Sequence, residues 1–326
     1  MFQTGWILAL QTLESGFLTV FMQMVSILGD GDVMPLLLLG FMFGLHLRAG
    51  FLSFHAWIWA ATINGVLKCL VRYPRPFHVD AAVRTPGLIN PGTLEAGGGG
   101  KGFFSLLPPA SRLPRGIVPV GGFSFPSAHC AGTAAWAGLS SGLLSRPLWR
   151  LSLSSWILVM AVSRLYLGMH FPADVIFGSL IGLSVAAALL PLGRSAVLQW
   201  WLQQPFLRFR AGWRRPLLLS AALGGPLLIL IIPHAYPTAA ARLLGLNLGF
   251  LAAWWRGLPA EQGRLRQRLT RVSIGLAIYG LIFFGPVLLL PGDEPAWLDM
   301  ARHFLAPFTA LAAGIPISIR IGAWSR

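Results

Sequence analysis

The chain has 326 residues, of which 55% are hydrophobic and only 11% carry a charge, and its mean hydropathy is +0.68. Soluble domains usually contain about 25% charged residues, so these values exclude an ordinary water-soluble domain. The net charge of +15 does not indicate a nucleic-acid-binding protein, because the basic residues punctuate apolar runs instead of forming one solvated face. The composition therefore predicts an all-α, polytopic membrane helix bundle whose surroundings are the lipid bilayer.

Apolar runs of membrane-spanning length recur along the chain and predict ten helices. Six form a predicted core, at about residues 1–28, 34–47, 51–71, 127–144, 151–167 and 171–190. Four more follow, at about residues 216–232, 238–255, 272–290 and 302–319. Between the groups, the Trp and Arg residues of 195–215 favour a helix lying in the membrane interface. We expect a six-helix core at 1–192, an amphipathic linker at 193–215 and a C-terminal four-helix region at 216–326.

One long polar segment, residues 72–126, separates the third and fourth predicted helices. It is rich in proline and contains four consecutive glycines at 97–100. Loops of this length are usually functional or disordered. We interpret it as an outer loop beside an active site, in which the glycine run is either a flexible linker or a hinge.

The distribution of basic residues predicts the orientation. With the N-terminus inside, the inner connections hold 15 of the 25 Lys and Arg residues, and the short outer connections 29–33, 233–237 and 291–299 hold none. The sequence thus predicts a multi-pass plasma-membrane (inner-membrane) protein with both termini in the cytoplasm and residues 72–126 facing the periplasm or outside. A cleavable leader is not expected, because the start of the chain lacks a basic stretch.

Three polar clusters fall at the predicted outer ends of helices three to six. They are Lys68-x6-Arg75-Pro76, then Pro126-Ser127-Ala128-His129, then Ser163-Arg164-x5-His170-x3-Asp174. A helix bundle can bring these ends together. We therefore expect three cations, two histidines, a carboxylate and the N-terminus of a helix at one site.

These residue types suit phosphoryl transfer. Arg75 and Arg164 can each hold two oxygens of an anion, and Lys68 adds a point charge. Fixed cations stabilise the charge on the equatorial oxygens of the transition state. Ser127, at the expected start of the fourth helix, exposes amides that suit an anion.

The same clusters contain candidates for covalent catalysis. His170 can attack phosphorus if Asp174, four residues later, holds its other ring nitrogen, and Pro172 is expected to start the helix that places Asp174 there. His129 can protonate the leaving oxygen. The sequence contains no carboxylate pair or Cys/His cluster typical of a metal site, so no metal or other cofactor is expected.

The three clusters resemble the signature of the type 2 phosphatidic acid phosphatase superfamily, over about residues 1–192. Ala128 stands where this signature often has glycine, a change that keeps the backbone amide. The resemblance implies that His170 forms a phosphohistidine, that Asp174 orients it, and that His129 acts as acid and then activates water. It also implies that the phosphoryl oxygens are held by Lys68, Arg75, Ser127, the Ala128 amide and Arg164.

The resemblance implies a metal-independent phosphatase with a lipid phosphate or diphosphate as substrate. The Arg-, Ala-, Leu- and Gly-rich composition favours a GC-rich bacterium, so undecaprenyl diphosphate is our first expectation. Phosphatidate, phosphatidylglycerophosphate, sphingoid phosphates and lipid A stay open. A lipid phosphotransferase and a lipid transporter or scramblase are the alternatives. The C-terminal helices could admit lipid, form a homodimer face, or move the product.

Several other residues have a structural interpretation. His55 and Glu14 are expected to have hydrogen-bonding or ionic partners inside the bundle. His78 and Arg84 are expected to be solvated loop residues, with contact to a second phosphate as the alternative. Cys69 and Cys130 are expected to be apolar filler, and the sequence does not tell whether they interact.

Overall fold

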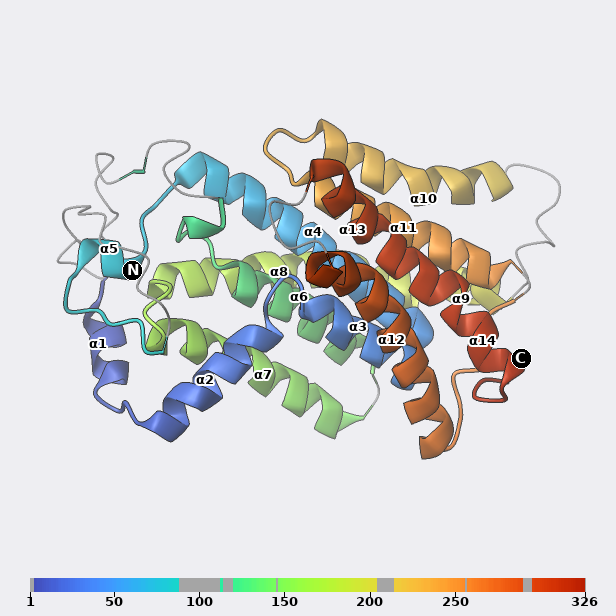
Figure 1. The fold of residues 1–326 in the computed structure, drawn as a ribbon, viewed down its shortest axis with the longest axis horizontal. Helices are drawn as coiled ribbons and strands as arrows, with labels where there is room; N and C mark the ends of the chain where they lie inside the picture. Colours follow the sequence, from blue (N-terminus) through green and yellow to red (C-terminus); the bar gives the residue numbers. More distant parts are fainter. Residues whose placement is uncertain are drawn as a thin grey trace. The chain divides into compact units, whose positions relative to one another are not determined.

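The computed structural model describes residues 3–87, 112–113, 120–144, 146–203, 214–255, 257–289 and 295–325. Helices dominate these residues, and the described part of the chain contains no β-strand (Figure 1). The predicted all-α class is confirmed. The glycine run at 97–100, and with it the linker-or-hinge question, lies outside the described residues.

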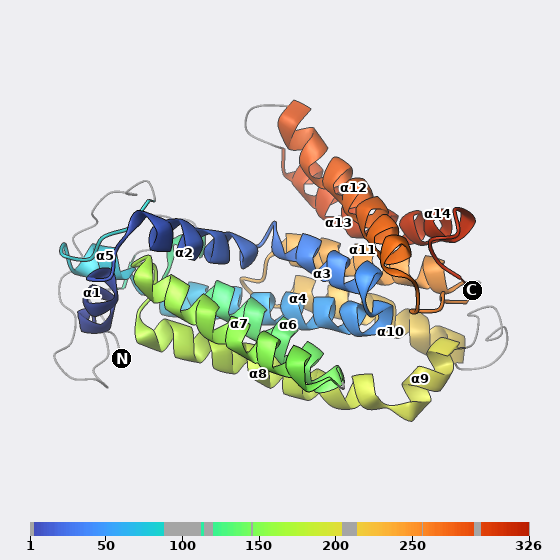
Figure 2. The same cartoon turned by 90° about the horizontal axis from the view of Figure 1, so that it is seen from below.

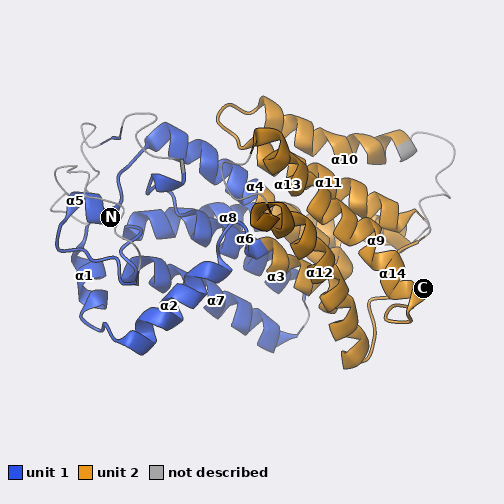
Figure 3. Ribbon diagram, viewed as in Figure 1, with its two compact units in different colours: residues 1–34, 59–188 blue, residues 35–58, 189–326 orange. Residues whose placement is uncertain are grey.

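The chain divides into two compact units (Figure 3). Unit 1 comprises residues 1–34 and 59–188, and unit 2 comprises residues 35–58 and 189–326. This division concerns packing alone, so the domain boundaries expected at residues 192 and 215 stay a prediction. The candidate site residues all belong to unit 1.

Unit 1 is built around α7, against which α1, α2 and α6 pack (Figures 1 and 2). Its helices are α1 (Gly5–Gln11), α2 (Gly16–Leu28), α5 (Pro76–Val79), α6 (Ala128–Leu143) and α7 (Pro147–Tyr166), with a 3-10 turn at Val120–Gly122. It also contains the C-terminal half of α4 (Leu47–Val71) and most of α8 (Pro172–Arg194). The prediction that Pro172 starts a helix is confirmed.

Unit 2 contains the N-terminal half of α4 and most of the C-terminal part of the chain. Its other helices are α3 (Met34–Gly44), which starts one residue before the unit, α9 (Ala196–Gln203), α10 (Arg214–Ile231), α11 (Pro237–Trp254), α12 (Leu265–Leu289), α13 (Ala296–Ala312) and α14 (Gly314–Arg320). Within it, α13 packs against α11 and α12, and α10 packs against α11. Only α9 represents the expected interfacial helix of 195–215, because residues 204–213 lie outside the described ranges.

Four helical segments are long and apolar enough to cross a membrane: Leu47–Val79, Pro147–Tyr166, Pro172–Arg194 and Leu265–Leu289. Large apolar side chains such as Leu158 and Leu281 are exposed on them. Such surfaces suit contact with lipid acyl chains, because water would not solvate them favourably. The chain is a multi-pass membrane protein.

The expectation of one span over residues 1–28 is wrong. The helix stops at Gln11 and restarts at Gly16, where Ser15 caps α2 by accepting a hydrogen bond from the Leu18 amide at 3.3 Å. Serine favours such N-cap positions because its hydroxyl satisfies an amide that lacks a helical partner. The expected last helix, 302–319, is also divided, into α13 and α14.

The N-terminal residues contact the segment that follows α5. Thr4 Oγ1 donates to Asp80 Oδ2 at 2.6 Å, and Arg84 pairs with Glu14 at 2.6 Å. These contacts place α1 at the end of unit 1 where α4 ends and α5 begins (Figure 1). The arrangement differs from the expected one, in which a first span separates the N-terminus from the site.

Of the residues with a structural interpretation, His55 and Glu14 have the expected partners, whereas His78 differs from the expectation. His55 Nε2 lies 2.7 Å from Asn247 Oδ1 inside unit 2, and Glu14 has the Arg84 partner described above. His78 is not a solvated loop residue, because it is buried in α5 and its Nδ1 accepts from the Arg75 amide at 3.3 Å. Cys69 and Cys130 are both free, and Cys130 packs in an apolar cluster.

Candidate active site

The end of α7 carries the sharp turn that leads to His170. The Met169 amide donates to the Arg164 carbonyl at 3.1 Å and the Gly168 amide to the Leu165 carbonyl at 2.9 Å. This pair of bonds is the Schellman motif, which requires a left-handed residue after the helix. Gly168 supplies it, with a φ of 67°. The motif fixes Arg164 and His170 on either side of one tight turn.

His170 and Asp174 form a buried pair. Nδ1 of His170 lies 3.3 Å from Asp174 Oδ2, and the side chains are 2% and 0% exposed. The Phe171 amide also donates to Asp174 Oδ2, at 2.8 Å. With Nδ1 engaged by the carboxylate, Nε2 of His170 is the nitrogen left for attack on a substrate.

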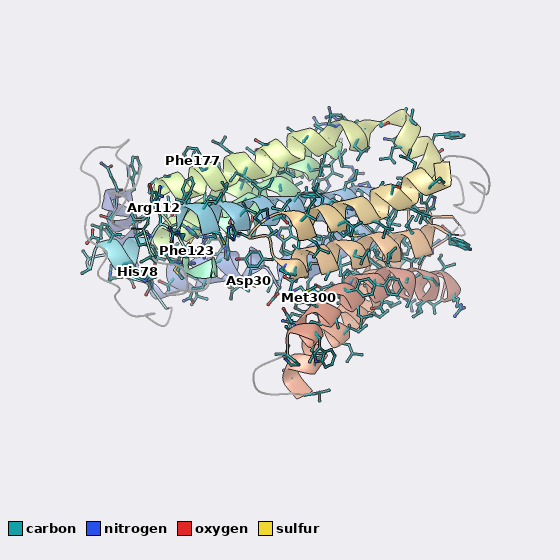
Figure 4. The ribbon with its side chains drawn as sticks, turned by 90° about the horizontal axis from the view of Figure 1, so that it is seen from above. Asp30, His78, Arg112, Phe123, Phe177 and Met300 are labelled. Atoms are coloured by element: carbon teal, nitrogen blue, oxygen red, sulfur yellow. The ribbon has the colours of Figure 1, made fainter. Side chains whose placement is uncertain are left out.

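Ser124 links this pair to α4. Its hydroxyl donates a short hydrogen bond to Asp174 Oδ2, and its amide donates to the Tyr73 carbonyl at 2.8 Å. Lys68 Nζ donates to the Ser124 carbonyl at 3.2 Å and also to the carbonyl of Phe123. Figure 4 shows Phe123 at the end of unit 1 that also carries His78. Lys68 and Asp174 are thus held by the same short segment.

The side chains of Arg75 and Arg164 are held by hydrogen bonds to carbonyl and hydroxyl oxygens. Arg75 donates to the Gly121 carbonyl at 2.6 Å and to the Gly122 carbonyl at 3.2 Å. Arg164 is 4% exposed, and its NH1 donates a short hydrogen bond to Ser26 Oγ of α2. The carbonyl and hydroxyl oxygens carry no full charge, so these hydrogen bonds hold both guanidinium groups without neutralising them, although the charges of Asp30 and Asp174 act on Arg164 and Arg75 respectively. Both guanidinium groups can attract an anion.

Close packing of α8 on the start of α6 places the second motif beside the third. A methyl group added to Gly178 would collide with the Ser127 carbonyl oxygen, and one added to Gly182 with the Ala131 carbonyl oxygen. The Ser127 amide donates to the Asp174 carbonyl at 2.9 Å. Small residues four apart allow helix backbones to approach closely in membranes.

Ser127 occupies the N-cap position of α6, as expected. It is fully buried, whereas Ala128 is exposed and His129 is half-buried. The start of α6 therefore presents its first residues toward open space while Ser127 is packed against α8. Amides at such a position favour an anion because they lack helical partners.

The electrostatics around His170 favour its neutral form. Burial lowers the pKa of His170 well below its usual value, and the charges of Arg164, Arg75, Lys68 and His129 lower it further. Each of these effects penalises the imidazolium ion. At neutral pH the ring is therefore unprotonated at Nε2, the state that a nucleophile requires.

The structure thus gathers the sequence-predicted residues into one region: the His170–Asp174 pair, Lys68, Arg75, Arg164, and the α6 start with Ser127, Ala128 and His129. Sequence reasoning missed Ser124, Ser26 and Gly168. A glycine two residues before His170 was a readable turn signal, whereas nothing in the sequence pairs Ser26 with Arg164. Among the described residues, no three His, Cys, Asp or Glu side chains gather where they could hold a metal ion.

Residues 49–197 match the family model of the PAP2 superfamily. Phosphatidylglycerophosphatase B of Escherichia coli is 42% identical over 69 residues, which cover 20% of this chain and 27% of the relative. The protein of the same name from Haemophilus influenzae is 33% identical over 129 residues, or 35% of this chain and 53% of the relative.

A third relative is named for a different substrate. Lipid A 4'-phosphatase of Bacteroides thetaiotaomicron is 36% identical over 62 residues, or 19% of this chain and 28% of the relative. The chain therefore spans about half, or less, of the length of these curated relatives. No solved structure matches the chain.

Proposed function

We propose that this protein is a membrane lipid phosphatase that removes phosphate from a lipid phosphate or diphosphate, because residues 49–197 match the family model of the PAP2 superfamily. The observation that carries the proposal is the buried His170–Asp174 pair, with Lys68, Arg75 and Arg164 close enough for their charges to act on His170. A neutral nucleophile among fixed cations suits an anionic phosphoryl group.

In the proposed first step, Nε2 of His170 attacks phosphorus and the bond between phosphorus and the lipid oxygen breaks. The departing oxygen takes a proton from His129, whose protonated form the negative charge of the bound phosphate stabilises. Asp174 stabilises the positive charge that the imidazole ring acquires in the phosphohistidine. Lys68, Arg75, Arg164, Ser127 and the Ala128 amide hold the three phosphoryl oxygens.

In the second step, His129 takes a proton from a water molecule that attacks the phosphohistidine. The nitrogen–phosphorus bond breaks, inorganic phosphate leaves, and neutral His170 is restored. The cations serve both steps because the charge on the phosphoryl oxygens develops in each of them. We propose that the reaction needs no metal ion.

We propose that the site faces the periplasm or outside. Within unit 1, Arg146 and Arg150 lie where α6 meets α7, at the opposite end of these helices from Ser127 and Arg164. Basic connections favour the cytoplasmic side. The Thr4–Asp80 contact supports an N-terminus on the side of the site. The cytoplasmic C-terminus and a homodimer through the C-terminal helices stay predictions.

We also propose which lipids should be tested as substrates. The names of two relatives favour phosphatidylglycerophosphate as the first lipid to test. Lipid A follows from a third, and undecaprenyl diphosphate stays the prediction from sequence. A panel of these lipids with phosphatidate, assayed with purified protein for free phosphate, should show a marked preference for one class.

The mechanism is tested with His170→Ala. We expect this variant to release no phosphate above background and to form no acid-labile phosphoprotein, while His234→Ala, a change of an exposed histidine, keeps wild-type activity. Wild-type activity should persist after treatment with a chelator. Undiminished phosphate release by folded His170→Ala protein would refute the phosphohistidine mechanism.

Two alternatives have distinct outcomes. A phosphotransferase would move labelled phosphate from one lipid to the hydroxyl of another instead of releasing it. A transporter or scramblase would flip fluorescent lipid across vesicle membranes even as the His170→Ala variant. The paired nucleophile and orienting carboxylate favour the hydrolase, because neither is needed for lipid movement.

A further inference from the structure

The C-terminal end of α2 contacts two candidate site residues, although α2 lies outside residues 49–197, the part that matches the PAP2 superfamily. Ser26 accepts a hydrogen bond from Arg164, and Gly29 lies against His129. We propose that Ser26 and Gly29 are positioning residues: Ser26 sets the guanidinium of Arg164 for the phosphate, and Gly29 leaves the space that the His129 ring needs. The inference rests on the proposed function.

Three hydrogen bonds fasten α2 to the end of α7. Thr19 Oγ1 lies 2.7 Å from the Tyr166 hydroxyl, Ser163 Oγ donates to the Met22 carbonyl at 2.7 Å, and Arg164 NH1 donates to Ser26 Oγ. The residues on α2 are three or four apart, so they follow one face of the helix. The opposite face carries exposed Phe17 and Met24. The polar face of α2 therefore packs against the C-terminal end of α7, where the third motif begins at Ser163.

Of these three contacts, only the one with Arg164 involves a residue that is expected to bind phosphate. Tyr166 and Ser163 have no assigned role toward phosphate, whereas Arg164 does. A neutral hydroxyl can hold a guanidinium group in place without cancelling its charge, whereas a carboxylate hydrogen-bonded to it would cancel that charge. Arg164 thus stays available to an anionic substrate while its long side chain is restrained, which lowers the entropy lost on binding.

The contact with His129 depends on the absence of a side chain at position 29. A Cβ there would lie 3.1 Å from His129 Cδ2 and 2.6 Å from Met160 Cε. The Gly29 φ of −94° is one that other residues adopt readily, so the requirement for glycine is one of space and not of backbone conformation. The nearby Gly31 has nothing within 4 Å of an added Cβ.

The experiment measures kcat and KM separately in matched variants. Ser26→Ala should raise KM about tenfold, the size expected for one charge-assisted hydrogen bond, and weaken competitive inhibition by inorganic phosphate equally. Ser26→Thr should restore both values. Thr19→Ala removes a bond between the same two helices that touches no site residue, so it should leave KM unchanged.

Two further variants test the reasoning about charge and space. Ser26→Asp should fold and yet lose inhibition by inorganic phosphate, because its carboxylate competes for Arg164. Gly29→Ala should lower kcat, whereas Gly31→Ala should not. The assignment of Ser26 would be overturned if Ser26→Ala and Thr19→Ala changed KM equally, or if inorganic phosphate inhibited Ser26→Asp normally. The assignment of Gly29 would be overturned if Gly29→Ala and Gly31→Ala changed kcat equally.

These outcomes separate the inference from the proposed function. If wild-type protein releases phosphate and His170→Ala does not, the proposed function stands whatever the α2 variants do. If His170→Ala stays active, the proposed mechanism fails, and binding of inorganic phosphate to the Ser26 variants, followed by calorimetry, still tests the positioning of Arg164.

Discussion

Ser124→Ala removes one of three donors from Asp174 Oδ2. The remaining donors are the Phe171 amide at 2.8 Å and His170 Nδ1 at 3.3 Å, and the carboxylate is fully buried. No water replaces the lost hydroxyl easily at such a site. A hydrogen bond to a charged group contributes about 1.5–3 kcal/mol, so full loss in the transition state lowers kcat by roughly 10- to 150-fold.

The effect should fall on kcat and not on KM. Lys68 is held by the carbonyl groups of Phe123 and Ser124, and these survive the substitution. Phosphate binding should therefore change little. In the step that forms the phosphohistidine, in which the His170 ring becomes positively charged, Asp174 should orient that ring less well. The rate at saturating lipid phosphate, measured with protein in detergent, reports this directly.

Two controls accompany the Ser124→Ala measurement. Ser124→Thr keeps the hydroxyl and should recover most of the rate. Ser152→Ala alters an exposed serine of α7 that bonds only to the Leu148 carbonyl in the described structure, at 2.9 Å, and should be silent. A thermally stable Ser124→Ala protein with wild-type kcat would show that the bond to Asp174 does not support catalysis.

The remaining predictions concern charge and packing. Arg75→Gln removes a cation that lowers the pKa of His170, so the acid limb of the rate should move to higher pH than in wild type; an unmoved limb with the same lipid would contradict this. Gly178→Ala should prevent stable folding or abolish activity because its methyl meets the backbone of Ser127, whereas Gly280→Ala meets nothing within 4 Å and should be tolerated. Burial raises the pKa of Glu261, but hydrogen bonds from His46 and the Arg48 amide outweigh it and lower the pKa overall. The ionised carboxylate therefore stabilises unit 2 above its usual pKa and this stability is lost as the pH falls; Glu261→Gln should unfold at lower temperature at pH 7 and show a weaker loss on acidification.

Much of the candidate site could be predicted from sequence because its residues come in motifs of fixed spacing. His170 and Asp174 are four apart across a helix start, a separation that brings side chains together whatever the rest of the fold. The start at Pro172 followed from the fixed φ of proline. Hydropathy likewise predicted the four described helical segments that are long and apolar enough to cross a membrane, because a membrane-spanning helix is recognised by its length and composition.

Other features depend on contacts between distant segments, which carry no local signal. The pairs Ser26–Arg164 and Ser124–Asp174 join residues from different helices and loops. The break at Ser15 was missed because residues 1–28 are apolar on average, and a short capped turn hardly changes that average. The sequence predicts a loop at His78 because α5 is a single helical turn, which hydropathy does not reveal.

The bond between Thr4 and Asp80 has a practical consequence for determining sidedness. A reporter protein fused before Thr4 would be carried on the same end of unit 1 as α5, so its folding or fluorescence in one compartment would report the compartment that the phosphate site faces. The sequence alone would have led to the opposite interpretation of that fusion. A second reporter in the Arg146–Arg150 turn should give the reverse signal, and the two together would assign the membrane face without any enzyme assay.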